Sequence, residues 1–321
     1  QLLAQNLVAG VDSFPLLAVP FFILAGELMN SGGISRRIID MAQAWVGHIR
    51  GGLGFVTIAA AILMASMSGS ALADTAALAT ILLPMMRKQG YPMNTSAGLV
   101  ASGGIIAPII PPSIPFVVFG VTTQLSITKL FLAGIVPGLL WAMTLSITWW
   151  FVARKEPTGD QHRFELRNCL KAMREGVWAL VLPVVIIGGM KAGVFTATEA
   201  AVVAVFYALG VGLFVYRGLR FGDLPPLLLS PLKTSSTIMF LVACAMVSAW
   251  LITIADIPAQ TIELLKPFMG NQMLLMFVIM VLVIIVGTAL DLIPTVLILG
   301  PILVPVVKMA GIDPYYFGVL F

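Results

Sequence analysis

The sequence predicts an all-α membrane protein that crosses the bilayer several times and contains broken helices, two re-entrant helical hairpins and an inverted repeat. Composition is the first reason: apolar residues make up 60% of the 321 residues and charged residues only 10%, with a mean hydropathy of +1.04. A soluble domain carries roughly a quarter charged residues. The second reason is that glycine, serine and proline interrupt apolar segments at places where a lipid-exposed helix would have to stay continuous.

The first half alternates full-length spans with shorter apolar arms. We expect a span at residues 14–29, an amphipathic interfacial helix at 34–48, short arms at 53–65 and 71–86, a broken helix at 95–106 and 114–123, and a full span at 130–152. In the interfacial helix, Arg36 and Arg37 oppose an apolar face, which is typical of a helix lying in the membrane surface. The two arms are too short for full spans and meet at Ser68-Gly69-Ser70, so they predict a re-entrant hairpin.

The broken helix is interrupted by a cluster of prolines. Four prolines fall within the eight residues 108–115, and each removes a backbone N–H donor and disrupts the helical hydrogen-bond ladder. Unpaired backbone groups are too costly in lipid, so such a break must be buried in protein or line an aqueous cavity. Two breaks this close in sequence predict a binding site built from helix ends.

A long polar segment at residues 154–174 separates the two halves and predicts a cytoplasmic loop. After it we expect spans at 177–190, 197–216 and 236–254, an interfacial helix at 257–268, and the arms of a second hairpin at 274–286 and 294–307. The tip of this second hairpin is Gly287-Thr288-Ala-Leu-Asp291. The predicted organisation is a first repeat at 1–153, the loop at 154–174, and a second repeat at 175–321 that ends after the second hairpin.

Motif order and charge placement indicate that the halves are inverted repeats. Gly69-Ser-Ala-Leu and Gly287-Thr-Ala-Leu stand at the two tips. If the loop is cytoplasmic, fourteen of the eighteen Lys and Arg residues lie on that side, as the positive-inside rule requires. The mouth of the first hairpin is then inside and that of the second is outside. Inverted repeats with broken helices are typical of secondary transporters, and nothing here resembles the selectivity filter of a channel.

Two acidic residues near the hairpin tips leave a second functional class, an enzyme, open. Asp74 stands in the first turn after the first tip, where a carboxylate complements the helix dipole, so we expect a capping role. Asp291 lies at membrane depth, which favours a functional role, although it could instead cap the following helix. The remote alternative is an intramembrane aspartyl protease in which the two carboxyl groups share a proton. No ATP-binding loop is present, and Cys169 and Cys244 show no metal-ligand spacing.

Several motifs carry a resemblance to a known family. They are Phe-Phe-Ile-Leu-Ala-Gly-Glu-Leu-Met-Asn30, Met-Ser-Gly-Ser-Ala-Leu-Ala-Asp74, Pro-Ile-Ile-Pro-Pro-Ser113 and Leu132-Ala-Gly-Ile-Val-Pro-Gly138. With these motifs and the second hairpin, the chain resembles the large permease subunit of tripartite ATP-independent periplasmic (TRAP) transporters, in the ion transporter superfamily. The family's opening spans and its second broken helix are not matched, so we expect a chain shortened at both ends.

The resemblance implies an elevator-type importer, driven by a sodium gradient, in the bacterial inner membrane. Such an importer works with a periplasmic substrate-binding protein that delivers an organic carboxylate, and with a small four-helix membrane subunit. It needs no cofactor besides Na⁺ as the coupling ion, and no nucleic acid is expected as a partner. The substrate would be a sugar acid, a sialic acid or a C4-dicarboxylate, with a preference for the first. The nearer alternative is a stand-alone sodium/carboxylate symporter of related architecture.

The resemblance also assigns roles to residues at the breaks. The residues expected at sodium sites are Ser70, Gly103, Gly104, Ile106 and Pro108, with Gly287 and Thr288 at the second tip. Those expected at the substrate are Ser68 and Ser113, to which we add Asp291 because it is an acid at membrane depth. Carbonyl and hydroxyl oxygens suit a hard cation, and the N-termini of half-helices attract a carboxylate. The structural alternative is that the serines only cap freed backbone N–H groups and that the glycines only permit a kink.

Overall fold

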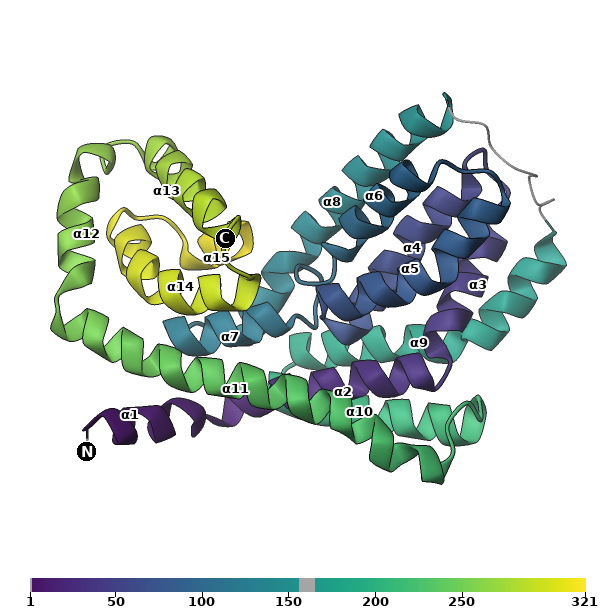
Figure 1. The fold of residues 1–321 in the computed structure, drawn as a ribbon, viewed down its shortest axis with the longest axis horizontal. Coiled ribbons are helices and arrows are strands. Elements are labelled where there is room, and N and C mark those ends of the chain that lie inside the picture. Colours follow the sequence, from purple (N-terminus) through teal and green to yellow (C-terminus); the bar gives the residue numbers. More distant parts are fainter. Residues whose placement is uncertain (1, 156–164) are drawn as a thin grey trace.

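The computed structural model describes residues 2–155 and 165–321, and within these ranges it is helical without strands. The elements of the first half are α1 (Leu2–Val11), η1 (Phe14–Leu17), α2 (Ala18–Ser31), α3 (Ile34–Val46), α4 (Gly52–Ser68), α5 (Ala71–Lys88), α6 (Met93–Gly104), α7 (Ile114–Thr123) and α8 (Ile127–Ala153). Those of the second half are α9 (Leu166–Lys191), α10 (Ala197–Gly210), η2 (Val211–Val215), η3 (Phe221–Asp223), α11 (Leu224–Ile254), α12 (Ile257–Leu265), η4 (Lys266–Phe268), α13 (Gln272–Gly287), α14 (Leu292–Met309) and α15 (Pro314–Leu320). Figure 1 shows α3 to α6 and α8 on one side and α12 to α15 on the other, with α7 below α14.

Several of these segments are long and apolar enough to cross a membrane. Within the described residues there are five, namely Phe14–Ser31, Ile127–Ala153, Ala197–Val215, Phe221–Ile254 and Leu292–Met309. Four of them coincide with predicted spans, and the fifth is the return arm of the second hairpin. The prediction of an all-helical, multi-span membrane protein is confirmed.

Two predicted boundaries are wrong. Helix α9 begins at Leu166, so the segment predicted as a loop at 154–174 is helical over its last nine residues; residues 156–164 of it lie outside the described part of the chain. Arg, Lys and Glu are good helix formers, and they occupy an exposed helix end as readily as a loop. Helix α11 begins at Leu224 instead of 236, because Pro225 and Pro226 occupy its first turn, where a missing N–H costs little. The prediction also omits the short helices α1 and α15.

Helix α2 packs against α3, α4 and α7 of the first half and against α10 and α11 of the second. Phe22 is fully buried and packs against Phe131 of α8, with ring centroids 6.4 Å apart. One turn further along, Gly26 lies against the tip of the first hairpin: a Cβ at this position would stand 3.1 Å from the Cβ of Ser68. Helix α2 therefore supports the tip from behind.

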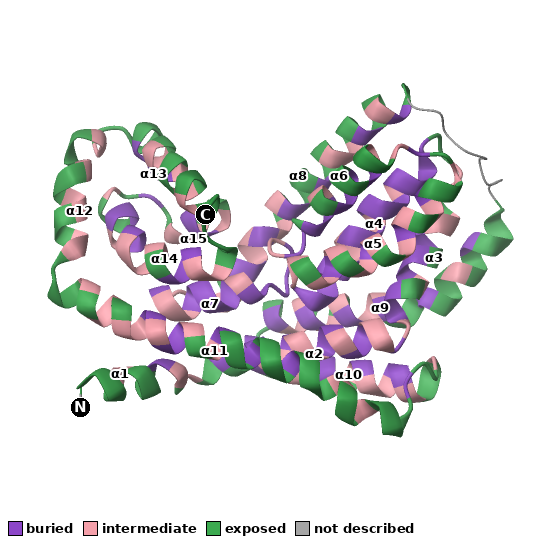
Figure 2. Cartoon of the chain, in the orientation of Figure 1, coloured by how far each residue is buried: buried purple, intermediate pink, exposed green. Residues whose placement is uncertain are grey.

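The same order of elements occurs in both halves. In the first half, span α2 leads through α3 into the hairpin α4–α5, and in the second, span α11 leads through α12 into the hairpin α13–α14. The two hairpins differ in burial. Helix α4 is buried along nearly all of its length, whereas α13 buries only Leu275 and Ile279. Figure 2 shows this contrast between a mostly buried α4 and a largely exposed α13.

Candidate functional site

The break between α6 and α7 is a compact run of turns closed by a serine. Ser113 is the N-cap of α7, and its hydroxyl accepts a hydrogen bond from the backbone N–H of Phe116 at 3.3 Å. The same hydroxyl donates to the carbonyl oxygen of Pro108. Ser113 is fully buried. One side chain therefore supplies partners to backbone groups on both sides of the interruption, as a break inside a membrane requires.

The tip of the first hairpin fits directly against this break. Gly69 has a left-handed backbone conformation with φ of +62°, and a Cβ there would lie 2.2 Å from the carbonyl oxygen of Pro112. The backbone N–H of Ile114 points at the carbonyl oxygen of Gly69, with an N···O distance of 3.5 Å. Only glycine combines this conformation with so close an approach. The two interruptions that the sequence singled out therefore meet in space.

A buried carboxylate lies behind the tip. The Ser68 hydroxyl donates to Asp74 Oδ1 at 2.5 Å and accepts from the backbone N–H of Ser70 at 3.2 Å. Asp74 is 1% exposed, and among the described residues its Oδ2 has no hydrogen-bond partner. The N-cap of α5 is Ser70, which accepts from the N–H of Ala73 at 3.4 Å. Asp74 stands in the first turn of α5, where the sequence analysis expected it to complement the helix dipole, and in addition it accepts a hydrogen bond from the tip serine.

The predicted carbonyl ligands of the break are held in local turns. The carbonyls of Gly103, Gly104 and Ile106 accept backbone N–H groups three residues further on, at 3.0–3.2 Å, and those of Gly103 and Ile106 each accept a second one, from Ile105 and Ile110. Gly104 lies against α5, since a Cβ there would stand 1.7 Å from Thr75 Oγ1. A Cβ at Gly103 would meet Ala61 at 3.4 Å, an ordinary contact. The structure thus joins Gly104 to the first hairpin through Thr75, a residue that the sequence analysis missed.

The predicted site residues of the second tip are exposed, unlike the buried residues of the first tip. Gly287, Thr288 and Asp291 are exposed. The Thr288 hydroxyl donates to the carbonyl of Ile285 at 2.7 Å, and Asp291 is the N-cap of α14, accepting from the N–H of Leu292 at 2.8 Å. In the described chain, no hydrogen bond or ion pair joins these residues to the first tip. Asp291 therefore occupies the capping position that the sequence analysis left open.

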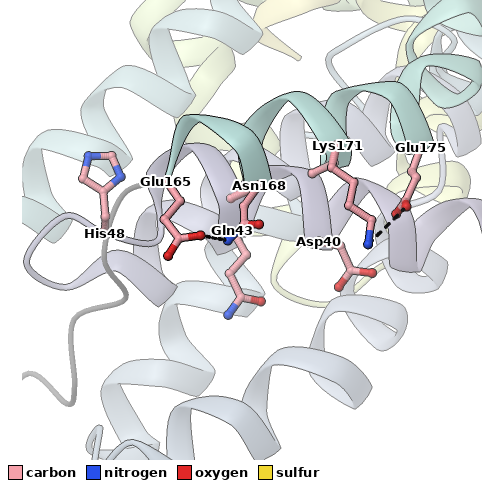
Figure 3. Close-up of a pocket in the computed structure, with 9 residues that line it drawn as sticks. Asp40, Gln43, His48, Glu165, Asn168, Lys171 and Glu175 are labelled. Carbon is pink, nitrogen blue, oxygen red and sulfur yellow. Dashed lines mark hydrogen bonds and ion pairs between the residues drawn. The ribbon is translucent and has the colours of Figure 1, made fainter.

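A small apolar cavity connects the second hairpin to the break. Its volume is about 230 Å³, and Pro108 and Phe116 line it from the first half while Leu292 and Val296 line it from α14. The start of α14 and the break after α6 thus face a shared space. A larger, polar cavity of about 520 Å³ lies between α3 and α9, and Figure 3 shows the residues that line it. No residue of either tip or of the break lines the polar cavity.

The polar cavity has an acidic lining. Asp40, Glu165 and Glu175 contribute carboxylates to it. Burial raises the pKa of Asp40, and the positive charges of Arg36 and Arg37 oppose that rise. Lys171 pairs with Glu175 at 4.0 Å, and both side chains are largely exposed. Such a pair contributes little to stability.

Comparison with known proteins identifies the family. Residues 1–321 match the DctM component of the tripartite ATP-independent periplasmic transporters. The chain belongs to this family. It is 56% identical over its whole length to the 2,3-diketo-L-gulonate TRAP transporter large permease of Escherichia coli, of which it covers 76%. It is also 56% identical to a putative TRAP large permease of Haemophilus influenzae, with the same coverage. The sialic acid TRAP large permease of Vibrio cholerae is 39% identical, with 99% of this chain and 74% of the relative aligned.

Membership of the DctM family tests several predictions made from the sequence. A TRAP large permease is a transporter component of the bacterial inner membrane, so the chain is not an enzyme and the aspartyl protease alternative is wrong. Large permeases of this family work with a substrate-binding protein and a small membrane subunit. One relative, the isethionate permease DctMQ of Oleidesulfovibrio alaskensis, is 37% identical to 99% of this chain, which covers 50% of that protein.

Proposed function

We propose that this chain is the large permease of an importer that moves an organic carboxylate into the cell and is driven by a sodium gradient. The observation that carries the proposal is the meeting of the first hairpin tip with the broken helix, next to the buried carboxylate of Asp74. Half-helices that end at a common point are the usual binding architecture of secondary transporters. Relatives named for 2,3-diketo-L-gulonate, sialic acid and C4-dicarboxylates support a carboxylate as the substrate.

The buried charge of Asp74 supports a cation as the coupling ion. An ionised carboxylate buried without a full set of partners is very costly, so it requires a cation or a proton nearby. Asp74 has one oxygen bonded to Ser68 and the other without a partner among the described residues. In this structure the carbonyl of Gly104 accepts one backbone hydrogen bond and those of Gly103 and Ile106 accept two each, so an ion reaches the latter oxygens only when these turns open. These oxygens, with Ser70 and Pro108, form our proposed sodium site; Gly287 and Thr288 belong to a second one.

We propose that the substrate binds at the two serines. Helix N-termini at Ala71 and Ile114 carry partial positive charge, which attracts a carboxylate without a buried Lys or Arg. Ser68 and Ser113 are buried and committed to internal hydrogen bonds in this structure. Substrate contact through either hydroxyl therefore requires the tip to separate from the break, and hinged or elevator-like motion of the hairpin supplies that step. Because the relatives at 56% include a diketogulonate permease, a sugar acid is the preferred substrate.

Uptake by the reconstituted transporter tests this function. The chain is purified with its small subunit and placed in proteoliposomes, and radiolabelled sugar acid, sialic acid and C4-dicarboxylate are offered with the cognate binding protein outside. An inward sodium gradient should drive uptake of one substrate class, and a potassium gradient should not. Equal uptake without the binding protein would favour a stand-alone symporter, and uptake that is independent of sodium would contradict the proposed coupling.

A further inference from the structure

Five basic side chains gather at the mouth of the first hairpin, on the end opposite its tip. Arg50 precedes α4, Arg87 and Lys88 end α5, and Arg154 and Lys155 follow α8. All five are exposed. A direct contact joins two of the segments, because Arg50 Nη2 donates to the carbonyl oxygen of Arg154 at 3.3 Å.

Trp149 holds these segments together. Its indole Nε1 donates to the carbonyl oxygen of Gly51 at 2.9 Å. The ring covers the start of α4 so closely that a Cβ at Gly54 would lie 1.8 Å from one of its carbons. On its other side, Tyr91 in the turn after α5 stacks on the indole, with centroids 6.2 Å apart and planes at 25°. The end of α8, the start of α4 and the α5–α6 turn thus form one surface, and Figure 1 shows them at the same end of this half.

In the described part of the chain, no carboxylate forms an ion pair with the basic side chains of this surface. Within the described residues the ion pair present joins Lys171 to Glu175, so none of the five basic groups lies within 4.0 Å of a described carboxylate. Three described acids, Asp40, Glu165 and Glu175, line the separate cavity between α3 and α9 (Figure 3). Five exposed cations on one described surface make it electrostatically suited to an anionic partner.

One face of α8 shows what kind of anion fits. Exposed residues follow each other at helical spacing of three or four along this face: Val136, Leu140, Met143, Ile147, Trp150 and Arg154. The first four are apolar, and Trp150 is followed one turn later by Arg154, whose guanidinium lies 3.5 Å above the indole ring. This order of residues matches the depths of one lipid leaflet: apolar residues face the acyl chains, an aromatic residue lies at the interface, and a basic residue meets the headgroup.

We propose that the basic mouth of the first hairpin binds the phosphate of an anionic phospholipid whose acyl chains lie along this face of α8. A small free anion would be held by the basic residues alone and would leave the adjoining apolar face unused. A phospholipid matches both parts at once. Clusters of basic residues beside membrane helices bind anionic headgroups by the same electrostatic attraction. The bound lipid would fix the mouth of the hairpin at the membrane surface, and this inference is independent of the proposed ion coupling.

Lipid competition on the purified transporter tests the proposal. The complete transporter is delipidated in detergent, offered equal amounts of phosphatidylglycerol and phosphatidylethanolamine with identical acyl chains, and analysed by native mass spectrometry. The wild type should retain phosphatidylglycerol preferentially. Each basic residue removed should weaken retention about fivefold, so the triple variant Arg50→Gln/Arg87→Gln/Arg154→Gln should lose the preference altogether.

Matched variants separate this site from general charge effects. Lys129→Gln removes a basic residue at the opposite end of α8 and should leave lipid retention unchanged. Arg154→Lys keeps the charge and should retain most of the binding. Equal retention of the two lipids by the wild type, or unchanged phosphatidylglycerol retention in the triple variant, would overturn the proposal. Complete displacement of the lipid by millimolar inorganic phosphate would also overturn it, because the site would then select a small anion.

Discussion

The two hairpins have similar arms but different tips. Their helices contain 17 and 18 residues in the first hairpin and 16 and 18 in the second. The return helix of each begins with a side-chain cap, Ser70 or Asp291. The first tip is buried between α2 and the break at Pro112, whereas the second tip is exposed. Short apolar arms and a capping residue are therefore enough to form a hairpin, but a closed site needs a broken helix facing the tip.

The largest expected effect concerns membrane sidedness, which is all or none. In a background with Cys169 and Cys244 replaced by alanine, single cysteines are placed at Gln89 and Met309, in the last turns of the two return arms. If the halves are inverted, an impermeant thiol reagent should label Gln89→Cys only from the cytoplasm and Met309→Cys only from the periplasm. Labelling of both from one side would remove the inverted-repeat assignment.

The next largest effect should distinguish the two acids. Asp74→Asn removes a buried charge while keeping the shape of the side chain, and sodium-driven uptake should fall by ~10- to 100-fold, since a hydrogen bond to a charged group is worth roughly 1.5–3 kcal/mol. Asp291→Asn keeps a good N-cap residue at an exposed position, and its effect should stay within about threefold on the same scale. Uptake is measured in proteoliposomes across a series of sodium concentrations. The reverse ranking of the two variants would move the functional acid to the second tip.

A smaller effect is expected at the serines. Ser68→Ala and Ser113→Ala should each lower uptake by ~10-fold at subsaturating substrate, because each loses one charge-assisted hydrogen bond to the substrate carboxylate. Binding of the periplasmic partner should be unaffected, which a pull-down of the purified proteins can check. If both variants transported at the wild-type rate, the serines would serve only as helix caps.

The smallest effects are on stability and compare the two tip glycines. Gly69→Ala places a side chain in a left-handed conformation, which costs roughly 1–2 kcal/mol, and sets its Cβ against the carbonyl oxygen of Pro112. Gly287→Ala meets no atom within 4 Å, so a change within ~0.5 kcal/mol is expected. Thermal unfolding of the purified variants measures both. Equal losses of stability would mean that the second tip is as tightly packed as the first.

Much of the fold could be predicted because its signals are local. Proline, serine and glycine mark where helices stop, and the limits 114–123 predicted for the second half of the broken helix match α7. The limits of α9 and α11 could not be found in this way, since charged residues and leading prolines are compatible with both loops and helix starts. Local rules thus predict the elements better than their ends.

The site depended on contacts that no local signal reveals. The bond between Ser68 and Asp74 exists because the left-handed turn at Gly69 folds the end of α4 back over the first turn of α5. The approach of Gly104 to Thr75 joins residues on different helices. For Asp291 the sequence left two readings open, and only its hydrogen bond to the N–H of Leu292 revealed a cap. A search for partners of every acid at membrane depth would have drawn attention to Ser68.

The contact between Trp149 and Gly51 has a consequence for biosynthesis. The two residues are 98 positions apart, and a ribosome adding about 5–20 residues per second needs roughly 5–20 s to make the intervening chain. During that interval the hairpin has no α8 to cover the start of α4. Until α8 is made, the earlier helices α2 and α3 can pack against α4, so the folding of the first hairpin is complete only after a much later part of the chain has been synthesised.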